Sequence, residues 1–217
     1  MSRRFDCSDP AAREQGLTMA ASVLRRGGLV LVPTDTVYAV AADAFSVPAV
    51  GALLEAKGRA RSTPVPVMVP SATTLSGILH RVDDDVTVLV EAFWPGALTL
   101  VAEAAPSLAW DLGATDGTVS VRMPLHPVML DLLKRTGPLA VMAANRIGEA
   151  APTTADEAEA SIGGAEGVEV LLDAGASPDP VTSSIVDLTG RVPLLIREGA
   201  IDADTLREFV PDLEVLT

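Results

Sequence analysis

A run of four apolar residues, Leu29 to Val32, follows a pair of glycines and ends at Pro33. Successive side chains of a strand point to opposite faces, so an unbroken apolar run predicts a strand that is buried on both faces. Such a strand needs a sheet with helices packed on each side. We therefore expect a layered α/β fold.

The expected helices and strands alternate irregularly along the chain. Helices are expected at residues 10–26, 46–56, 71–79, 84–93, 126–135, 154–161 and 202–209. Strands are expected at 29–32, 65–69, 98–102, 118–123, 139–142, 168–173, 184–188 and 194–196, with loops at 161–167 and 174–182. Pro66 favours a place near the sheet edge for its strand. This order predicts a twisted mixed sheet flanked by helices, not a regular parallel barrel.

Composition indicates a soluble, cytoplasmic chain. Its 217 residues are 48% hydrophobic and 21% charged, which fits one globular domain over 1–217. The apolar runs are too short to span a membrane, and charges interrupt residues 1–20, so no signal peptide is expected. Cys7 is the only cysteine, which excludes an intrachain disulfide and fits a reducing compartment.

The net charge of −13 makes the chain a poor candidate for tight tRNA binding, because such binding depends on Lys and Arg at phosphates. Lys57 and Lys134 are the only lysines, and Lys57 stands beside Arg59 and Arg61. Such a cluster is either a solvated helix end or a local cationic site.

The common nucleotide and metal signatures are absent: there is no P-loop, no G-x-G-x-x-G and no H-E-x-x-H. His80 and His126 are too few for a histidine metal site, and the three aspartates 83–85 suit a helix start. Polar groups instead follow the expected strands, where loops of an open α/β sheet form a ligand crevice. These segments are 33–38, 57–59, 93–99, 119–124, 144–145, 183–188 and 197–199.

In order and spacing, these segments resemble the YrdC-like threonylcarbamoyl-AMP synthases, in their short form. The family's P-T-[ED]-T-V-Y corresponds to Pro33–Tyr38, its K-x-R to Lys57–Arg59 and its W-P-G-x-L-T to Trp94–Thr99. The later R-x-P, S-x-N, S-[ST]-[IV]-V-D and R-x-G correspond to residues 122–124, 143–145, 183–187 and 197–199. The resemblance covers about residues 15–200.

The resemblance implies a YrdC-like sheet with a concave nucleotide groove and an enzyme that joins L-threonine, bicarbonate and ATP into threonylcarbamoyl-adenylate. The implied catalytic residues are Lys57 and Arg59. Those implied for ATP are Arg59, Thr63, Thr118, Asn145 and Arg197. Those implied for L-threonine are Thr36, Arg122 and Ser183. Tyr38 is expected in the groove wall, Mg²⁺ is expected to arrive with ATP, and the product is expected to pass to a tRNA threonylcarbamoyl-transfer complex.

Several positions depart from the family pattern. Ala143 replaces the serine of S-x-N, Ala39 replaces a common glycine, and Met68 stands where a histidine is frequent. Losing a hydroxyl contact costs roughly 0.5–1.5 kcal/mol, which weakens activity without abolishing it. Two alternatives remain: a degenerate YrdC-like nucleotide- or RNA-binding module without catalysis, and a related carbamoyl-adenylate-forming domain.

Overall fold

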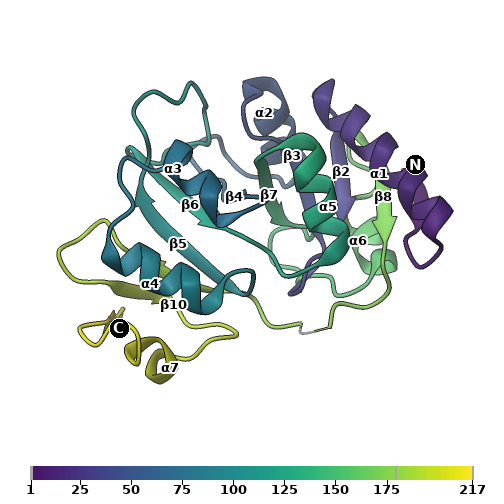
Figure 1. Cartoon of the computed structure of the whole chain (residues 1–217). Coiled ribbons are helices and arrows are strands. Elements are labelled where there is room, and N and C mark those ends of the chain that lie inside the picture. Colours follow the sequence, from purple (N-terminus) through teal and green to yellow (C-terminus); the bar gives the residue numbers. More distant parts are fainter. Residues whose placement is uncertain (1, 179, 217) are drawn as a thin grey trace.

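The computed structural model describes residues 2–178 and 180–216, which form one sheet of eleven strands. The strand order across the sheet is β1-β8-β2-β3-β7-β4-β6-β5-β9-β10-β11 (Figure 1). The strands are β1 (Arg3–Asp6), β2 (Leu29–Val32), β3 (Ala39–Asp43), β4 (Val67–Met68), β5 (Leu98–Glu103), β6 (Thr118–Arg122), β7 (Leu139–Ala143), β8 (Val168–Asp173), β9 (Ser184–Asp187), β10 (Leu194–Arg197) and β11 (Glu214–Val215). The α-helices are α1 (Pro10–Arg25), α2 (Val47–Ala56), α3 (Leu75–Ile78), α4 (Asp84–Phe93), α5 (Pro127–Thr136), α6 (Ala155–Ile162) and α7 (Ala203–Arg207), and a 3₁₀ turn, Ala72–Thr74, precedes α3.

The sheet is mixed, as the sequence predicts. Strand β2 runs parallel to β8 and antiparallel to β3, while β4 runs parallel to β6 and antiparallel to β7. The expected edge position of the Pro66 strand is wrong, because β4 lies in the interior of the sheet. Pro66 precedes the two paired residues, and its carbonyl accepts a hydrogen bond from the Val141 amide at 2.9 Å. A proline there needs no amide hydrogen, so the ladder tolerates it.

Strand β2 is buried on both faces, which confirms the prediction from its apolar run. Leu29 and Leu31 belong to one hydrophobic cluster, and Val30 and Val32 belong to the other. Each of these four side chains is fully inaccessible to solvent. The strand therefore separates two cores, which is why no polar residue interrupts it.

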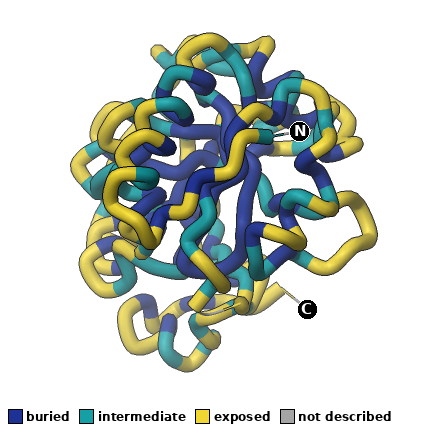
Figure 2. The backbone as a smooth tube through the Cα atoms, turned by 90° about the vertical axis from the view of Figure 1, so that its right-hand side faces the viewer, coloured by how far each residue is buried: buried dark blue, intermediate teal, exposed yellow. Residues whose placement is uncertain are grey.

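The two cores lie on opposite faces of the sheet. Helices α1 and α5 lie side by side and contribute one core with Phe5 of β1 (Figure 1). Helices α2, α3, α4 and α6 contribute the other core, which continues along most of the sheet. Figure 2 shows the central strands as buried backbone and the connecting segments as exposed. The first strand, β1, and the last, β11, form the two edges of the sheet.

The expected helices agree with the structure to within a few residues. Their caps explain the starts: Asp9 accepts a hydrogen bond from the Ala12 amide at 2.7 Å, and Ser46 and Thr154 cap α2 and α6 in the same way. The strands β1, β3 and β11 were not predicted. The described part of the loop 174–182 holds no helix or strand, and position 179 lies outside the described residues. None of the described helices has the length and apolarity needed to cross a membrane.

Candidate functional site

A cavity of about 320 Å³ opens on the face of the sheet that also carries α1 and α5. It lies over strands β3, β7, β4, β6, β5 and β9, and it is also lined by the loops before β3 and β9, the segment after α2, the loop after β7 and the end of β10. Its lining combines hydroxyls, cations and apolar side chains. The lining residues are Thr34, Thr36, Val37, Ala39, Lys57, Arg59, Pro66, Val67, Met68, Thr99, Ser120, Arg122, Val141, Met142, Ala143, Asn145, Thr182, Ser183, Ile185 and Arg197.

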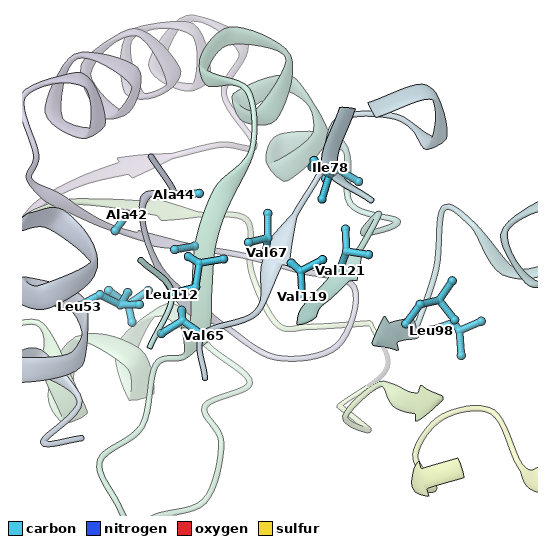
Figure 3. Packing of buried hydrophobic residues seen from close by; sticks show 14 of the residues in the cluster. Ala42, Ala44, Leu53, Val65, Val67, Ile78, Leu98, Leu112, Val119 and Val121 are labelled. Carbon is cyan, nitrogen blue, oxygen red and sulfur yellow. The ribbon is translucent and has the colours of Figure 1, made fainter. Parts of the chain in front are cut away.

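Side chains point alternately to the two faces of each strand, and those on one face line the cavity. On β6, Ser120 and Arg122 line the cavity, whereas Val119 and Val121 point into the core on the opposite face (Figure 3). On β5, Thr99 likewise lines the cavity, and its chain neighbours Leu98 and Leu100 lie in the core. One layer of backbone thus carries the core on one side and the polar cavity on the other.

The loop after β2 places two threonines in the cavity wall. Thr34 is buried, and its hydroxyl donates to the Val37 carbonyl at 2.7 Å and accepts from the amides of Thr36 and Val37. This local network holds the short connection between β2 and β3 in a fixed shape. The Thr36 hydroxyl accepts a hydrogen bond from Nη1 of Arg122 at 3.1 Å.

Arg122 is almost fully buried although it carries a charge. Its Nε donates to the Gly96 carbonyl at 2.9 Å, and its Nη2 lies 2.7 Å from Oδ2 of Asp35. Nη2 is buried, and Asp35 is its charged partner among the described residues. Burial lowers the pKa of Arg122, which Asp35 opposes. A guanidinium that lines a cavity is a site for an anion such as a carboxylate.

The turn before β5 must be compact to reach Arg122. The Trp94–Pro95 peptide bond is cis, and the Trp94 indole donates to the Leu98 carbonyl at 2.8 Å. A β-carbon at Gly96 would lie 2.4 Å from the Phe93 carbonyl oxygen, so glycine is required there. The W-P-G segment therefore brings the Gly96 carbonyl to the guanidinium.

A second network joins Ser183, Thr99 and Arg197. The two hydroxyls lie 2.9 Å apart, and Arg197 donates from Nη2 to the Ser183 hydroxyl at 3.0 Å and from Nε to the Ser183 carbonyl at 2.9 Å. Desolvation and the nearby charge of Arg122 lower the pKa of Arg197. A β-carbon at Gly199 would lie 2.2 Å from the Thr182 carbonyl oxygen. The glycine of R-x-G thus lets the two segments meet at this point.

Lys57 caps the C-terminal end of α2 and is 5% exposed. Its ammonium donates to the Ala143 carbonyl at 2.6 Å, to the side-chain oxygen of Asn145 at 3.0 Å and to the Asn145 carbonyl. Burial, followed by the charge of Arg59, lowers the pKa of Lys57 to about 8. Lys57 therefore ties α2 to the loop after β7 while it lines the cavity.

The structure brings seven of the nine sequence-predicted site residues together in the cavity lining: Thr36, Lys57, Arg59, Arg122, Asn145, Ser183 and Arg197. Arg59 is exposed and makes no side-chain hydrogen bond or ion pair with the described residues. Thr63 and Thr118 are outside the lining. Thr118 lies on the same face of β6 as Ser120, two residues farther from the cavity, and donates to the Thr115 carbonyl at 2.7 Å.

The sequence prediction missed four hydroxyl residues of the lining: Thr34, Thr99, Ser120 and Thr182. The first three fall inside the polar strand-end segments, so the signal was present but did not single out these residues. The expectation that Tyr38 forms the groove wall is wrong. Tyr38 is fully buried in the core and donates to the Gly175 carbonyl at 2.7 Å, whereas its neighbours Val37 and Ala39 line the cavity.

The charge around the cavity is positive, unlike that of the whole chain. Four cationic side chains line it, and the lining contains no carboxylate. Among the described residues, no group of three or more His, Cys, Asp or Glu side chains is placed to hold a metal ion. The site therefore suits an anionic ligand.

Comparisons with known proteins agree on one protein family. The family model Sua5/YciO/YrdC, described as "Telomere recombination", matches residues 22–199. A putative threonylcarbamoyl-AMP synthase of Mycobacterium tuberculosis is 48% identical over 210 residues, which is 97% of this chain and 96% of that protein.

Solved structures agree with this similarity. The P. abyssi Sua5 structure complexed with L-threonine matches with a TM-score of 0.90 and 28% identity. That match covers all of this chain, which spans 62% of the length of the P. abyssi chain. E. coli YciO, at 20% identity and a TM-score of 0.81, shares the fold over 95% of this chain and all of its own.

Proposed function

The chain belongs to the Sua5/YciO/YrdC family, and from this we propose that it is an enzyme that makes threonylcarbamoyl-AMP. Its substrates are L-threonine, bicarbonate or CO₂, and ATP, and its second product is pyrophosphate. The mycobacterial relative, similar over nearly its whole length, supports this activity, as does the likeness to a threonine-bound Sua5. The reaction is a nucleotidyl transfer.

The observation that carries the proposal is the guanidinium of Arg122 beside the hydroxyls of Thr36 and Ser183 in a cationic cavity. A planar guanidinium suits the carboxylate of an amino acid, and the hydroxyls suit its polar groups. Lys57, Arg59 and Arg197 lie in the same lining and suit phosphates. We therefore assign Thr36, Arg122 and Ser183 to L-threonine, and the other three cations to ATP.

The chemistry has two steps. The threonine nitrogen adds to the carbon of CO₂ and loses a proton, which gives a carbamate. A carbamate oxygen then bonds to the α-phosphorus of ATP as the bond to the pyrophosphate oxygen breaks. Reactions of this kind require positioning and stabilisation of charge more than covalent help from the protein. Lys57 and Arg59, as the catalytic residues, supply that charge.

Asn145, Thr63 and Thr118 are assigned to the nucleotide. Asn145 accepts from Lys57 and donates to the Glu149 carbonyl at 2.8 Å, so it is held at the cavity wall. Thr63 and Thr118 lie beyond the lining, and their assignment requires that ATP extend outward past Ser120. Mg²⁺ enters with ATP, held by phosphates and water, because the lining offers no carboxylate ligand.

The acidic charge of the chain supports a division of labour with other proteins. The adenylate is a small, diffusible product, so its maker does not need to bind tRNA. We propose that a separate tRNA threonylcarbamoyl-transfer complex consumes it, in the cytoplasm.

The test is pyrophosphate release by the purified protein with ATP, Mg²⁺ and bicarbonate, with and without L-threonine. We expect release that requires both threonine and bicarbonate and falls by about 100-fold or more in Lys57→Ala, as for loss of a charge that stabilises a transition state. The matched control is Lys134→Ala, since this exposed lysine pairs with Asp131 on α5, away from the cavity. ATP binding without threonine-dependent release would refute the enzyme and favour a non-catalytic nucleotide-binding module.

A further inference from the structure

The ion pair between Asp35 and Arg122 is more deeply buried than the other ion pairs of the described residues. Its side chain is 10% exposed and that of its partner Arg122 is 6% exposed. In every other ion pair of the described residues, at least one partner is 37% or more exposed. A carboxylate is rarely buried unless it has a specific task, since water must be removed from it.

Asp35 does not touch the cavity itself. Its neighbours Thr34 and Thr36 line the cavity, whereas Asp35 does not, so it contacts Arg122 from behind. His126, at the start of α5, lies within electrostatic reach, but burial lowers its pKa and keeps it neutral. Arg122 is therefore the charged partner of Asp35 among the described residues.

Three segments hold the Arg122 guanidinium from three directions. The Gly96 carbonyl accepts from Nε at 2.9 Å, the Thr36 hydroxyl accepts from Nη1 at 3.1 Å, and Asp35 lies 2.7 Å from Nη2. Only the Asp35 contact compensates the charge. Without it, a desolvated cation would sit in the wall with no counter-ion, and the side chain would gain by moving toward water or Ser183.

We propose that Asp35 is a positioning residue for amino-acid binding: its ion pair with Nη2 holds the Arg122 guanidinium in the cavity wall that is assigned to the substrate carboxylate. The inference rests on the proposed function. It assigns to Asp35 no contact with substrate and no proton transfer. We expect its effect at the amino-acid end of the cavity, because Lys57, which is assigned to ATP, is held by the loop after β7.

The test compares Asp35→Asn with the wild-type enzyme in the pyrophosphate-release assay, while L-threonine and ATP are varied separately. Asparagine keeps the shape and removes the charge. We expect the KM for L-threonine to rise by about tenfold or more, with the KM for ATP changed by less than about threefold. Asp35→Glu, which restores the charge, should recover most of the threonine affinity.

The matched control is Asp131→Asn, which breaks an ion pair of 2.6 Å with Arg13 between α5 and α1. It should leave both KM values unchanged. An unchanged KM for threonine in Asp35→Asn overturns the inference while the proposed function stands. Equal loss of threonine and ATP binding, or failure of Asp35→Glu to recover, also overturns it, because these outcomes indicate a merely structural role. A wild-type enzyme without threonine-dependent release refutes the proposed function, and this inference with it.

Discussion

Lys57 is a charged residue that is almost fully buried. Its ammonium donates to oxygens of Ala143 and Asn145, so the group ties α2 to the loop after β7. A phosphate that enters the cavity would meet this ammonium together with Arg59 and Arg197. Lysine in such a place responds to pH within the physiological range, unlike the arginines.

The pKa of Lys57, about 8, predicts a pH dependence of nucleotide binding. Burial lowers this pKa, so the ammonium is present below about pH 8 and is lost as the pH rises through that value. ATP affinity should therefore fall across this range, while the phosphates of ATP stay ionised. Calorimetric titration with ATP alone measures this without interference from the threonine amine.

Lys57→Gln is the control for this prediction, because glutamine cannot titrate. It should bind ATP weakly at every pH and show no dependence through pH 8. Wild-type ATP affinity that is constant to about pH 9.5 would contradict a lowered pKa of Lys57 that governs nucleotide binding.

At the level of single residues, the sequence predicts which site residues are neighbours along the chain. It does not predict contacts between residues that meet only when the chain folds. Lys57 and Arg59 could be placed together because they are neighbours. The pair of Asp35 and Arg122 could not, since the two residues come from the loop after β2 and from β6. Thr99 and Ser183 likewise meet only because β5 and β9 are parallel neighbours.

At the level of elements, the strands that were predicted are rich in Val, Leu and Ile, and those that were missed are not. β3 is rich in alanine, a poor strand former, and is fixed by its antiparallel pairing with β2 and β7. β1 is short and charged, and β11 has two residues. Their pairing is a property of the assembled sheet, so local sequence gives little sign of it.

The contact of the segment after β10 with the start of β9 predicts a sensitive position. In Gly199→Ala, the new β-carbon would meet backbone atoms of Thr182 and Ser183, which cannot move aside as a flexible side chain would. We expect a loss of about 1–3 kcal/mol in the free energy of unfolding, measured by chemical denaturation. The KM values should rise as well, because Ser183 and Arg197 are displaced.

Gly164→Ala is the matched control, since a β-carbon at this position would have no neighbouring atom within 4 Å. Its free energy of unfolding should stay within about 0.5 kcal/mol of the wild type. Equal stability of the two variants would show that the segments around Gly199 can separate without cost.

At the level of the whole molecule, the net charge of −13 contrasts with the four cations of the cavity. The cavity attracts small anions, whereas the remaining surface repels a polyanion. We expect tRNA to bind with a Kd weaker than about 100 µM at physiological salt, measured by fluorescence anisotropy. Micromolar binding that falls steeply as salt rises would contradict this and would support an RNA-binding role.

Strands β5 and β6 separate the core from the cavity, so a substitution on one face of these strands can affect the other face. On β6, Val119 and Val121 alternate with Ser120 and Arg122, so a substitution in the core can displace a neighbour that lines the cavity by moving a single peptide unit. Laboratory evolution of amino-acid preference therefore has two sets of positions to draw on. Variants selected for a larger or smaller substrate should include changes on the core-facing side of β5 and β6, and not only in the cavity lining.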